Sequence, residues 1–568
     1  MTTQVPVLFT YQTPLDNPPI GANFVNIVNG HLSLDSGNTT PASIGIGIGS
    51  PPYDPTGAPI LTGPQRFLGF GVNIDFGAFY GALYWNGSAE VYNTSTQATI
   101  GTWLDNLVNL GVRVVRIHDL DIGLSANLFC STTGPQTTTR TLDPVSMDLL
   151  GWFFNQCKTR NIRVIITMHF GRQLINATDT PPVSSPSFTE CSTSASPYTG
   201  LTGMMHPWFW YDTGLQYLQT EYIQNVLTYV NPYTSIALGR DPTLLAVILQ
   251  NETSLSTNVP ATGYNGSLYP VLQSMWTAST QAWAAANGVT WSTMNAVQFN
   301  EWAIQLETQV LQAQATFARG YTSALIIANT FYGNAPYGIV KSMYDSGDIM
   351  DFHIYSRSTL TDPDALLAPP IGNPGGLRTG FSACAAGCTF NKPTICTEWT
   401  PVAQANPNMR NPTNDTRVPD SERSQAIAAV VNAAIEQDLD IICLYSYLRN
   451  PVNYDLSVWT PGVYDFIDDA VFLNGIRAAI AAFHDIDNRP TSTTLVTLSP
   501  QDYYGSMGGS YNPPVSPFND PDLYGISQTT KIQMFFGTVL PTLIGQGFSV
   551  PHITRSTVAV FTMPDFAQ

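Results

Sequence analysis

The sequence predicts an α/β protein with a (β/α)8 barrel, and three observations support this fold class. Short apolar runs alternate with helix-like segments from residue 65 to residue 485. Most of these runs are apolar at nearly every position, which is typical of strands covered on both faces. Eight such units fit a closed parallel barrel. A doubly wound open sheet is the alternative fold, but no glycine-rich phosphate-binding loop follows the first run to support it.

Each predicted strand is a short apolar run. The segments between the runs have helical periodicity, so consecutive strands are expected to be parallel. In chain order, the eight strands are expected at residues 67–74, 112–117, 163–168, 244–250, 324–328, 349–354, 393–396 and 440–445.

Helices are expected between these strands. In residues 97–110 the apolar side chains form one stripe, and Gly111 stands where a C-terminal cap belongs. Asp143 and Pro144 give the next helix a cap residue and a proline in its first turn. The remaining helices are expected at 215–230, 301–319, 421–437 and 465–483.

Two flanking regions differ from the barrel in pattern. Residues 1–64 form an N-terminal extension of strands and loops, with a strand pair expected at 24–28 and 31–34. The predicted barrel domain spans 65–485, and residues 486–568 are expected to form a β-rich C-terminal appendage. Strands of this appendage are expected at 493–498, 531–536 and 556–562.

Composition limits the classes of partner. Hydrophobic residues make up 43% of the chain and aromatic residues 11%, as in globular proteins. A formal net charge of −18 argues against binding to nucleic acid or to an anionic membrane surface. No apolar run reaches the roughly 20 residues that span a bilayer, and no signal peptide is visible. The Thr- and Asn-rich, charge-poor composition nevertheless favours an extracellular or cell-surface location.

The cysteine pattern indicates no metal site. There are seven cysteines, and no His or second Cys pair stands at metal-ligand spacing. We therefore expect no metal and no other cofactor. Cys396 and Cys443 lie in predicted strands and are interpreted as packed thiols. One or two disulfides are compatible with the loop cysteines Cys130, Cys191, Cys384 and Cys388.

Two of the nine glutamates, Glu252 and Glu398, stand directly at the end of a predicted strand. Two carboxylates at the mouth of a barrel are what glycosidic bond cleavage requires, because one donates a proton and the other attacks the sugar carbon. Glu252 alone could be a strand-end cap. A second Asn-Glu pair, Asn300-Glu301, is interpreted as a helix N-cap with an acid in the first turn.

Polar side chains lie at the ends of seven of the eight predicted strands. Because the C-terminal ends of barrel strands meet on one face, these side chains are expected to converge there. The positions are Asn73 and Asp75, Arg116 and His118, His169, Asn251 and Glu252, His353 and Tyr355, Glu398 and Trp399, and Tyr445 and Tyr447.

Taken in order, these motifs resemble the glycoside hydrolases of clan A, retaining enzymes of the family 5 type. The resemblance covers residues 65–485 as an ordering of motifs. It includes Gly-Val-Arg-Val-Val-Arg ending at Arg116, Asn251-Glu252, Asp-Phe-His-Ile-Tyr ending at Tyr355, and Thr-Glu-Trp around Glu398. The resemblance implies that Glu252 is the acid/base and Glu398 the nucleophile.

The resemblance also implies supporting roles. Asn251 would bind the 2-hydroxyl of the sugar, and Arg116 and Tyr355 would keep Glu398 ionised and oriented. His169 and His353 would contact the substrate or the acid/base. The chain departs from the commoner family pattern in two places, Thr253-Ser254 after the Asn-Glu pair and Tyr445-Ser-Tyr447 at the eighth strand.

Aromatic residues are expected to bind the sugar. Trp399 and Tyr447 would offer flat apolar faces to the C–H face of a pyranose. Trp208 and Trp210, in the long segment 171–214, form either a sugar platform or a small core of that segment. His118 is interpreted either as a loop hydrogen-bond donor or as a substrate contact.

The sequence therefore predicts a retaining glycoside hydrolase that cleaves β-linked oligosaccharides or polysaccharides by double displacement. One alternative is a non-catalytic carbohydrate-binding protein, or a structural protein of a virion or cell surface, on the same barrel. A second alternative is a transglycosylase that uses the same residues. The sequence indicates neither the sugar nor the oligomeric state.

Overall fold

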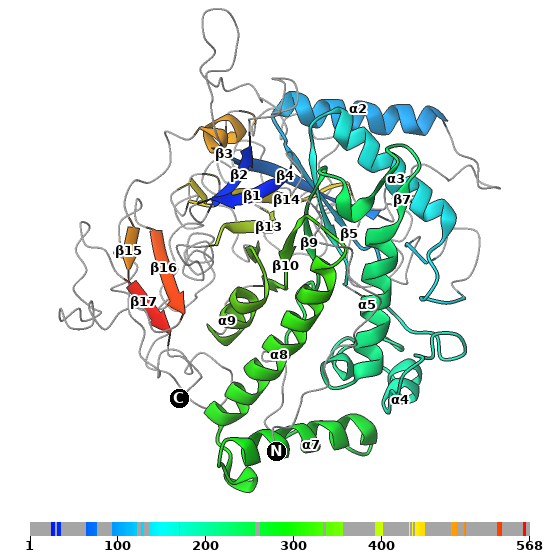
Figure 1. Ribbon diagram of the computed structural model, residues 1–568, viewed down its shortest axis with the longest axis vertical. Coiled ribbons are helices and arrows are strands. Elements are labelled where there is room, and N and C mark those ends of the chain that lie inside the picture. Colours follow the sequence, from blue (N-terminus) through cyan, green and yellow to red (C-terminus); the bar gives the residue numbers. More distant parts are fainter. Residues whose placement is uncertain are drawn as a thin grey trace, which may run out of the picture.

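A computed structural model describes the barrel and parts of both flanking regions (Figure 1). The described residues are 24–28, 31–35, 64–76, 94–121, 127–129, 137–169, 171–255, 262–332, 337–355, 392–400, 431, 434–435, 438–448, 477, 479–485, 493–495, 531–536 and 560–563.

The central element is a nine-stranded sheet in which every neighbouring pair of strands is parallel. The sheet order is β10-β9-β6-β5-β4-β14-β13-β12-β11. The bounds are β4 Gly69–Asp75, β5 Val114–His118, β6 Arg163–Thr167, β9 Leu244–Ile248, β10 Leu325–Ile327, β11 Thr330–Tyr332, β12 Met350–Tyr355, β13 Thr394–Thr400 and β14 Ile441–Leu448.

The two outermost strands of this order are consecutive in the chain. Only Ala328 and Asn329 separate β10 from β11. β10 pairs with β9, and β11 pairs with β12. β10 and β11 therefore act as one interrupted strand that joins the two ends of the sheet, giving eight positions around a barrel. The predicted (β/α)8 fold class is confirmed, and each strand begins within two residues of its expected start.

Apolar side chains fill the barrel on both sides of the sheet. One cluster joins residues of six strands, such as Val114, Ile165 and Ile441, to the N-terminal hairpin, and this cluster is the barrel interior. A larger cluster joins strand residues such as Phe70 to helix residues such as Leu104. Alternate residues of a strand point to opposite faces, so each strand contributes to both layers.

Helices α2 (Thr94–Leu110), α3 (Pro144–Thr159), α5 (Thr213–Thr228), α8 (Ala296–Arg319) and α9 (Tyr337–Ser346) lie around the sheet (Figure 1). Asp143 caps α3 by accepting from the amide of Ser146 at 2.8 Å, as expected. Gly111 adopts a φ of 95° after α2, a conformation that favours glycine. Within 421–437 and 465–483, all the described residues (431, 434–435, 477 and 479–483) are helical.

The expected start of the helix at Asn300-Glu301 is wrong. Helix α8 begins at Ala296, and Asn295 with Gln298 forms a capping box there. The side chain of Asn295 accepts from the Gln298 amide, and the Gln298 side chain accepts from the Asn295 amide, each at 3.0 Å. Because Asn295-x-x-Gln298 satisfies two helix-end amides at once, it is the stronger N-terminal signal.

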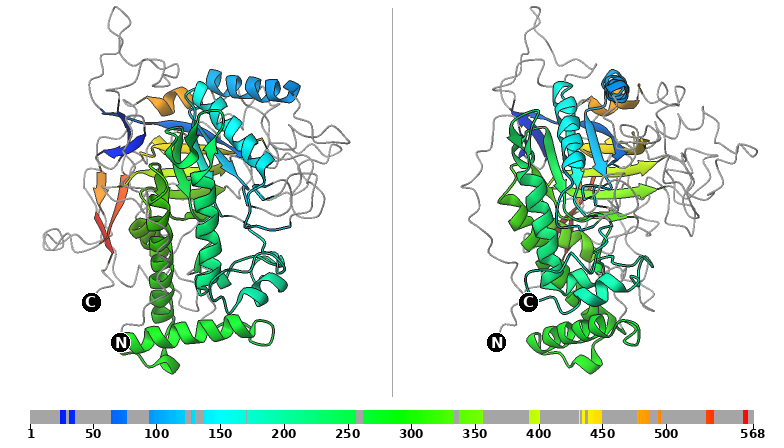
Figure 2. Two further views of the ribbon diagram at one scale, coloured as in Figure 1. Left: turned by 45° about the vertical axis from the view of Figure 1, so that its right-hand side comes forward. Right: turned by 90° about the vertical axis from the view of Figure 1, so that its right-hand side faces the viewer.

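Two long connections after β6 and β9 build a separate apolar cluster. They contain α4 (Phe188–Thr193), η3 (Trp208–Trp210), α7 (Pro270–Ala286) and η5 (Trp291–Thr293). Figure 2 shows α7 lying across the end of α8, away from the barrel strands. Their aromatic side chains form a cluster with residues of α5 and α8.

The N-terminal hairpin lies against the opposite end of the barrel. Strands β1 (Val25–Val28), β2 (His31–Asp35) and β3 (Pro64–Arg66) are antiparallel, which confirms the expected strand pair. Arg66 and the amide of Leu32 both donate to Asp440, directly before β14, at 2.6 and 2.8 Å. The hairpin is thereby fixed at the N-terminal ends of the barrel strands.

The chain also contains short elements outside the barrel. β7 (Val230–Asn231) and β8 (Ile236–Ala237) form a small hairpin followed by η4 (Leu238–Arg240). Strands β15 (Thr493–Leu495), β16 (Lys531–Phe536) and β17 (Val560–Met563) form a parallel sheet where the appendage strands were expected. The division of the chain at residues 64 and 486 stays a prediction.

Cys396 and Cys443 are free, buried thiols, as expected. Cys191 is also a free buried thiol, and it contacts the carbonyl oxygen of Met204 at 3.3 Å. The expectation of a disulfide is therefore wrong for Cys191, because this residue packs inside α4 and its neighbours. Cys130, Cys384 and Cys388 lie outside the described residues. None of the described helices is long and apolar enough to cross a membrane.

Candidate active site

A buried polar cluster lies at the C-terminal ends of the barrel strands. Its centre is Glu398 on β13, which is 4% exposed. Arg116 on β5 donates from Nη1 to one carboxylate oxygen of Glu398, and His118 Nε2 lies 3.4 Å from the same oxygen. The other carboxylate oxygen lies 3.5 Å from Nδ1 of His353 on β12.

Arg116 connects four strands of the barrel. Besides Glu398, its guanidinium donates to Asn73 at 3.1 Å, to Thr167 at 3.1 Å and to Asn251 at 2.5 Å. The side chain is fully buried. A planar guanidinium offers five donors in a fixed arrangement, so these partners determine its orientation toward Glu398.

The two predicted carboxylates meet at His353. Nδ1 of His353 lies 2.5 Å from Glu252 Oε1. One carboxylate oxygen of Glu252 and one of Glu398 lie within 4.8 Å of each other. Their environments differ, because the side chain of Glu398 is 5% exposed whereas that of Glu252 is 28% exposed. The structure thus brings together two residues that are far apart in the sequence.

The hydrogen bonds around His353 fix where its protons lie. Asp351 accepts from the Thr397 amide at 2.9 Å and from the Thr397 hydroxyl at 2.6 Å. The hydroxyl has then used its only proton, so its oxygen accepts from Nε2 of His353 at 3.1 Å. Nδ1 of His353 is thereby directed at the carboxyl group of Glu252.

The electrostatic environment favours an ionised Glu398. Burial alone would raise the pKa of Glu398, but the positive charges of His353 and Arg116 and the hydrogen bond from His118 hold it well below its usual value. Burial raises the pKa of Asp351 to about 6, so Asp351 is ionised at neutral pH.

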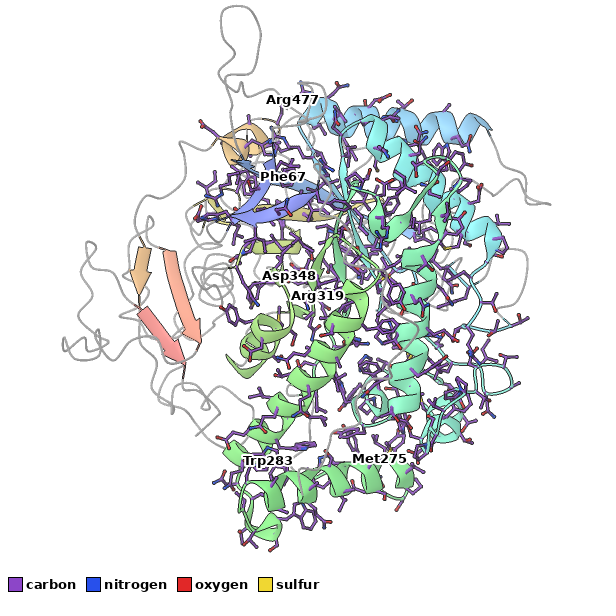
Figure 3. The ribbon with its side chains drawn as sticks, viewed as in Figure 1. Phe67, Met275, Trp283, Arg319, Asp348 and Arg477 are labelled. Carbon is purple, nitrogen blue, oxygen red and sulfur yellow. The ribbon has the colours of Figure 1, made fainter. Side chains whose placement is uncertain are left out.

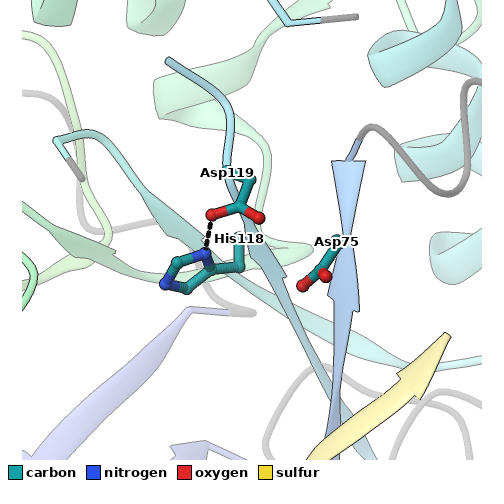
Figure 4. Close-up of side chains that lie close together, drawn as sticks. All are labelled: Asp75, His118 and Asp119. Atoms are coloured by element: carbon teal, nitrogen blue, oxygen red, sulfur yellow. Dashed lines mark hydrogen bonds and ion pairs between the residues drawn. The ribbon is translucent and has the colours of Figure 1, made fainter. Parts of the chain in front are cut away.

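His118 forms a second charged pair beside Glu398 (Figure 4). Its Nδ1 bonds to the carboxylate of Asp119, and Asp75 on β4 points toward the same pair. Burial alone would lower the pKa of His118, but Asp119 and the hydrogen bond to Glu398 raise it to about 10. His118 therefore carries a positive charge at neutral pH.

The Asn251-Glu252 segment is held in a strained turn after β9. Glu252 adopts a left-handed φ of 51°, a conformation that costs a non-glycine residue about 1–2 kcal/mol. Its amide donates to the Thr330 hydroxyl at 3.0 Å, and that hydroxyl lies 3.2 Å from Asn251 Oδ1. The buried Nδ2 of Asn251 has no hydrogen-bond partner among the described residues.

One expectation about the predicted site residues is wrong, that Trp399 offers a face to the sugar. Trp399 is fully buried and packs edge-on against Phe70 at 6.2 Å, in the layer between sheet and helices. Neighbouring strand residues point to opposite faces, so Glu398 inside the barrel places Trp399 outside. His169 is bonded to Asp121 at 3.0 Å, and its ring lies 4.9 Å from that of His206. Glu252 is bonded to His353, and a contact of His169 with the substrate stays a prediction.

The other predicted residues are placed as follows. Trp208 and Trp210 are fully buried in the cluster of the long connections, so the interpretation as a small core is confirmed. The ring of Tyr445 lies 6.2 Å from that of His118. Tyr355 and Tyr447 lie on β12 and β14, but their side chains lie outside the described part of the chain.

The residues that position the site were partly missed by sequence reasoning. Asp351 begins the Asp-Phe-His-Ile-Tyr motif and stands two residues before His353. This spacing in a strand predicts that both side chains point to the same face. Thr167, Thr330 and Thr397 carry no comparable signal, because threonine at a strand end is common.

Two groups of described residues have ligand atoms at metal-binding spacing. They are Asp75, His118 and Asp119, and Glu252, His353 and Glu398. In each group the histidine Nδ1 is already bonded to a carboxylate of the same group.

The fold and site together define a (β/α)8 barrel with a carboxylate pair at its C-terminal mouth. No protein-family model and no curated protein matches the chain. Among solved structures, it is similar to a glycoside hydrolase family 5 mannosidase from Rhizomucor miehei, with 13% identity and a TM-score of 0.46 over 74% of this chain and 94% of that chain.

Two further solved structures are similar at the same level. The endo-β-1,4-mannanase from Thermotoga petrophila has 12% identity and a TM-score of 0.44 over 76% of this chain and 83% of that chain. GH5_18 from Streptomyces cattleya, in complex with Manβ1-4GlcNAc, has 13% identity and a TM-score of 0.48 over 82% of this chain and 94% of that chain.

Proposed function

We propose that this protein is a retaining glycoside hydrolase that cleaves β-linked oligosaccharides or polysaccharides. The observation that carries the proposal is the pair Glu252 and Glu398, whose carboxylate oxygens lie within 4.8 Å in unlike environments. Retaining enzymes place their two carboxyl groups about 5–5.5 Å apart, whereas inverting enzymes need about 6.5–9.5 Å to admit a water. The short separation favours retention.

In the first step, Glu398 attacks the anomeric carbon while Glu252 protonates the leaving glycosidic oxygen. The bond between the anomeric carbon and that oxygen breaks, and a glycosyl ester with Glu398 forms. The low pKa of Glu398 keeps it ionised for this attack. His353 Nδ1, 2.5 Å from Glu252 Oε1, holds the Glu252 carboxyl group in place for this proton transfer.

In the second step, Glu252 removes a proton from a water molecule that attacks the anomeric carbon. The ester bond to Glu398 breaks, and the sugar leaves with the configuration that it had in the substrate. Arg116 and His118 stabilise the carboxylate as it re-forms. The proton returns to the pair of Glu252 and His353, which completes the cycle.

Asn251 is proposed to bind the 2-hydroxyl of the sugar. Its Oδ1 is held by Arg116, so its Nδ2 is oriented away from the guanidinium. This buried amide nitrogen has no partner among the described residues. A buried N–H donor without an acceptor costs free energy, so a hydroxyl oxygen of the substrate is proposed to accept this hydrogen bond.

The proposal is tested with Glu398→Gln and Glu252→Gln on chromogenic β-glucosides, β-mannosides and β-galactosides. Loss of the acid/base is expected to lower kcat by about 10²–10⁴-fold. Glu398→Gln is expected to reduce turnover to background, and an activated 2-fluoro sugar is expected to label Glu398 in the unmodified protein. Azide is expected to restore part of the activity of a Glu252 variant.

Full activity in either variant would rule out the assignment. Binding of saccharides without turnover or labelling would favour a non-catalytic carbohydrate-binding protein instead. Transfer to an added acceptor sugar in preference to water would identify a transglycosylase with the same residues. The polysaccharides that match the cleaved glycosides then define the substrate, and a location outside the cell stays part of the proposal.

A further inference from the structure

A cavity of about 440 Å³ lies between α7, α8 and the start of α5. This volume falls within the range of about 300–1,000 Å³ of small-molecule sites. The cavity shares no residue with the polar cluster around Glu398. Figure 3 shows Met275 and Trp283 on the side of α7 that faces α8, and both residues line the cavity.

The cavity exists because small side chains occupy one face of α7. Ala278, Ala282 and Ala286 line it at a spacing of four residues, which places them on one face of the helix. Across from them, Trp302 and Leu306 of α8 are buried. Larger residues at the three alanine positions would fill the space, so the sequence of α7 leaves it open.

The lining contains no charged residue. All 14 lining residues are neutral, and they include three indole rings and one phenol ring beside three glutamines, one asparagine and one serine. A charged ligand would lose its hydration without a compensating partner in this cavity. The lining therefore fits a neutral molecule with both apolar faces and hydrogen-bonding edges.

The hydrogen bonds of the cavity leave donors open. The indole N–H of Trp283 donates to Gln305 Oε1 at 2.9 Å, and the indole N–H of Trp302 donates to Ser279 Oγ at 3.0 Å. Because an indole can only donate, the amide oxygen of Gln305 must face Trp283 and its NH2 group points elsewhere.

We propose that this cavity is a second saccharide-binding site that takes one or two units of a neutral glycan. A pyranose has an apolar C–H face that packs against indole rings, and its hydroxyl oxygens accept from the NH2 group of Gln305 and the hydroxyl of Ser279. Exposed Gln309 and Asn287 lie at the opening, where a longer chain would leave the cavity. The proposal does not depend on whether Glu252 and Glu398 hydrolyse a glycan.

The test uses the full chain with Glu252→Gln and Glu398→Gln, so that no probe is cleaved. Binding of the β-1,4-linked hexasaccharides of glucose, mannose and xylose is measured by titration calorimetry. Ala282→Phe fills the cavity and is expected to weaken binding of at least one probe tenfold or more, or to remove one site per chain. Ala285→Phe, on the exposed side of the same helix, is the matched control and is expected to bind like the parent.

A second variant distinguishes the loss of a ligand contact from a disturbance of helix packing by the introduced phenylalanine. Gln309→Ala removes an exposed amide at the opening and is expected to weaken the same probe about fivefold, the value of one hydrogen bond. A hexasaccharide of galacturonate, which is charged, is expected not to bind the cavity. The proposal is wrong if Ala282→Phe and Ala285→Phe bind all neutral probes alike, or if no neutral probe binds. It is also wrong if Ala282→Phe abolishes galacturonate binding.

Discussion

The two ends of the barrel each pair an arginine with a buried carboxylate, and the surroundings of the two pairs differ. At the N-terminal end, Arg66 lies 2.6 Å from Asp440 and 2.7 Å from Asp438. At the C-terminal end, Arg116 is paired with Glu398. Burial alone would raise the pKa of Asp440, but His31, Arg66 and the amide of Leu32 lower it. Both ends thus stabilise an ionised carboxylate.

The difference lies in what surrounds each pair. At the N-terminal end, two carboxylates share one arginine, and the hairpin supplies the remaining donors. At the C-terminal end, Arg116, His118 and His353 surround Glu398, and a second carboxylate, that of Glu252, lies nearby and partly exposed. The C-terminal pair thus differs from the N-terminal pair in having a second, partly exposed carboxylate beside it.

The largest expected effect is on catalytic activity, and it distinguishes Arg116 from Arg66. Arg116→Lys is expected to lower kcat by about 100-fold or more, because an ammonium cannot bridge Asn73, Asn251 and Glu398 in one plane. The acidic limb of the pH profile is expected to move to higher pH as Glu398 loses a fixed guanidinium. Arg66→Lys is the control, with kcat expected within about twofold of the parent. Equal losses in both variants would contradict the comparison.

The next largest expected effect is on stability, and it concerns Arg66. Arg66→Leu leaves Asp440 buried without its main charge partner, which is expected to lower the free energy of unfolding by about 3–5 kcal/mol. Urea unfolding measures this loss, and kcat at 25 °C is expected to stay unchanged. The double variant Arg66→Leu with Asp440→Leu is expected to lose less, because no unpaired charge remains. A larger loss in the double variant would show that the pair is not the cause.

A third effect depends on pH at the C-terminal end. The pKa of His118 is raised from 6.5 to about 10, so the protonated form stabilises the folded state. This contribution is fully present below about pH 6.5 and is lost as the pH rises toward 10. The difference in unfolding free energy between the parent and His118→Gln is therefore expected to shrink between about pH 6 and about pH 9.5. A difference that is constant with pH would refute the charged state of His118.

The smallest expected effect comes from the histidine at the other end. His31 Nδ1 lies 3.2 Å from Asp440, and its side chain is 28% exposed. His31→Gln is expected to lower the free energy of unfolding by about 1 kcal/mol or less, because solvent replaces much of the lost hydrogen bond. Urea unfolding at neutral pH measures this value, and activity is expected to be unchanged. A loss as large as that of Arg66→Leu would mean that His31 contributes as much as Arg66 to holding the hairpin against the barrel.

The fold was predictable because buried parallel strands carry a local signal. Each of the eight strands is an apolar run at its place in the chain, and β4, β5, β6, β9, β10, β12, β13 and β14 begin within two residues of the expected positions. The caps at Asp143 and Gly111 are local as well. The start of α8 was missed because Asn300-Glu301 imitates the capping signal that Asn295 and Gln298 form.

The sequence by itself determined the barrel and the two carboxylates at its mouth, because strand order decides which side chains share one face. Only the tertiary structure decided which groups touch. A register shift in β13 accompanies the placement of Trp399 in the outer layer. His353 lies between Glu252 and Glu398, and its ring is held there by the hydroxyl of Thr397 on the neighbouring strand β13. Such contacts join residues remote in the chain, and hydrogen-bond geometry over a few ångströms leaves no periodic mark in a sequence.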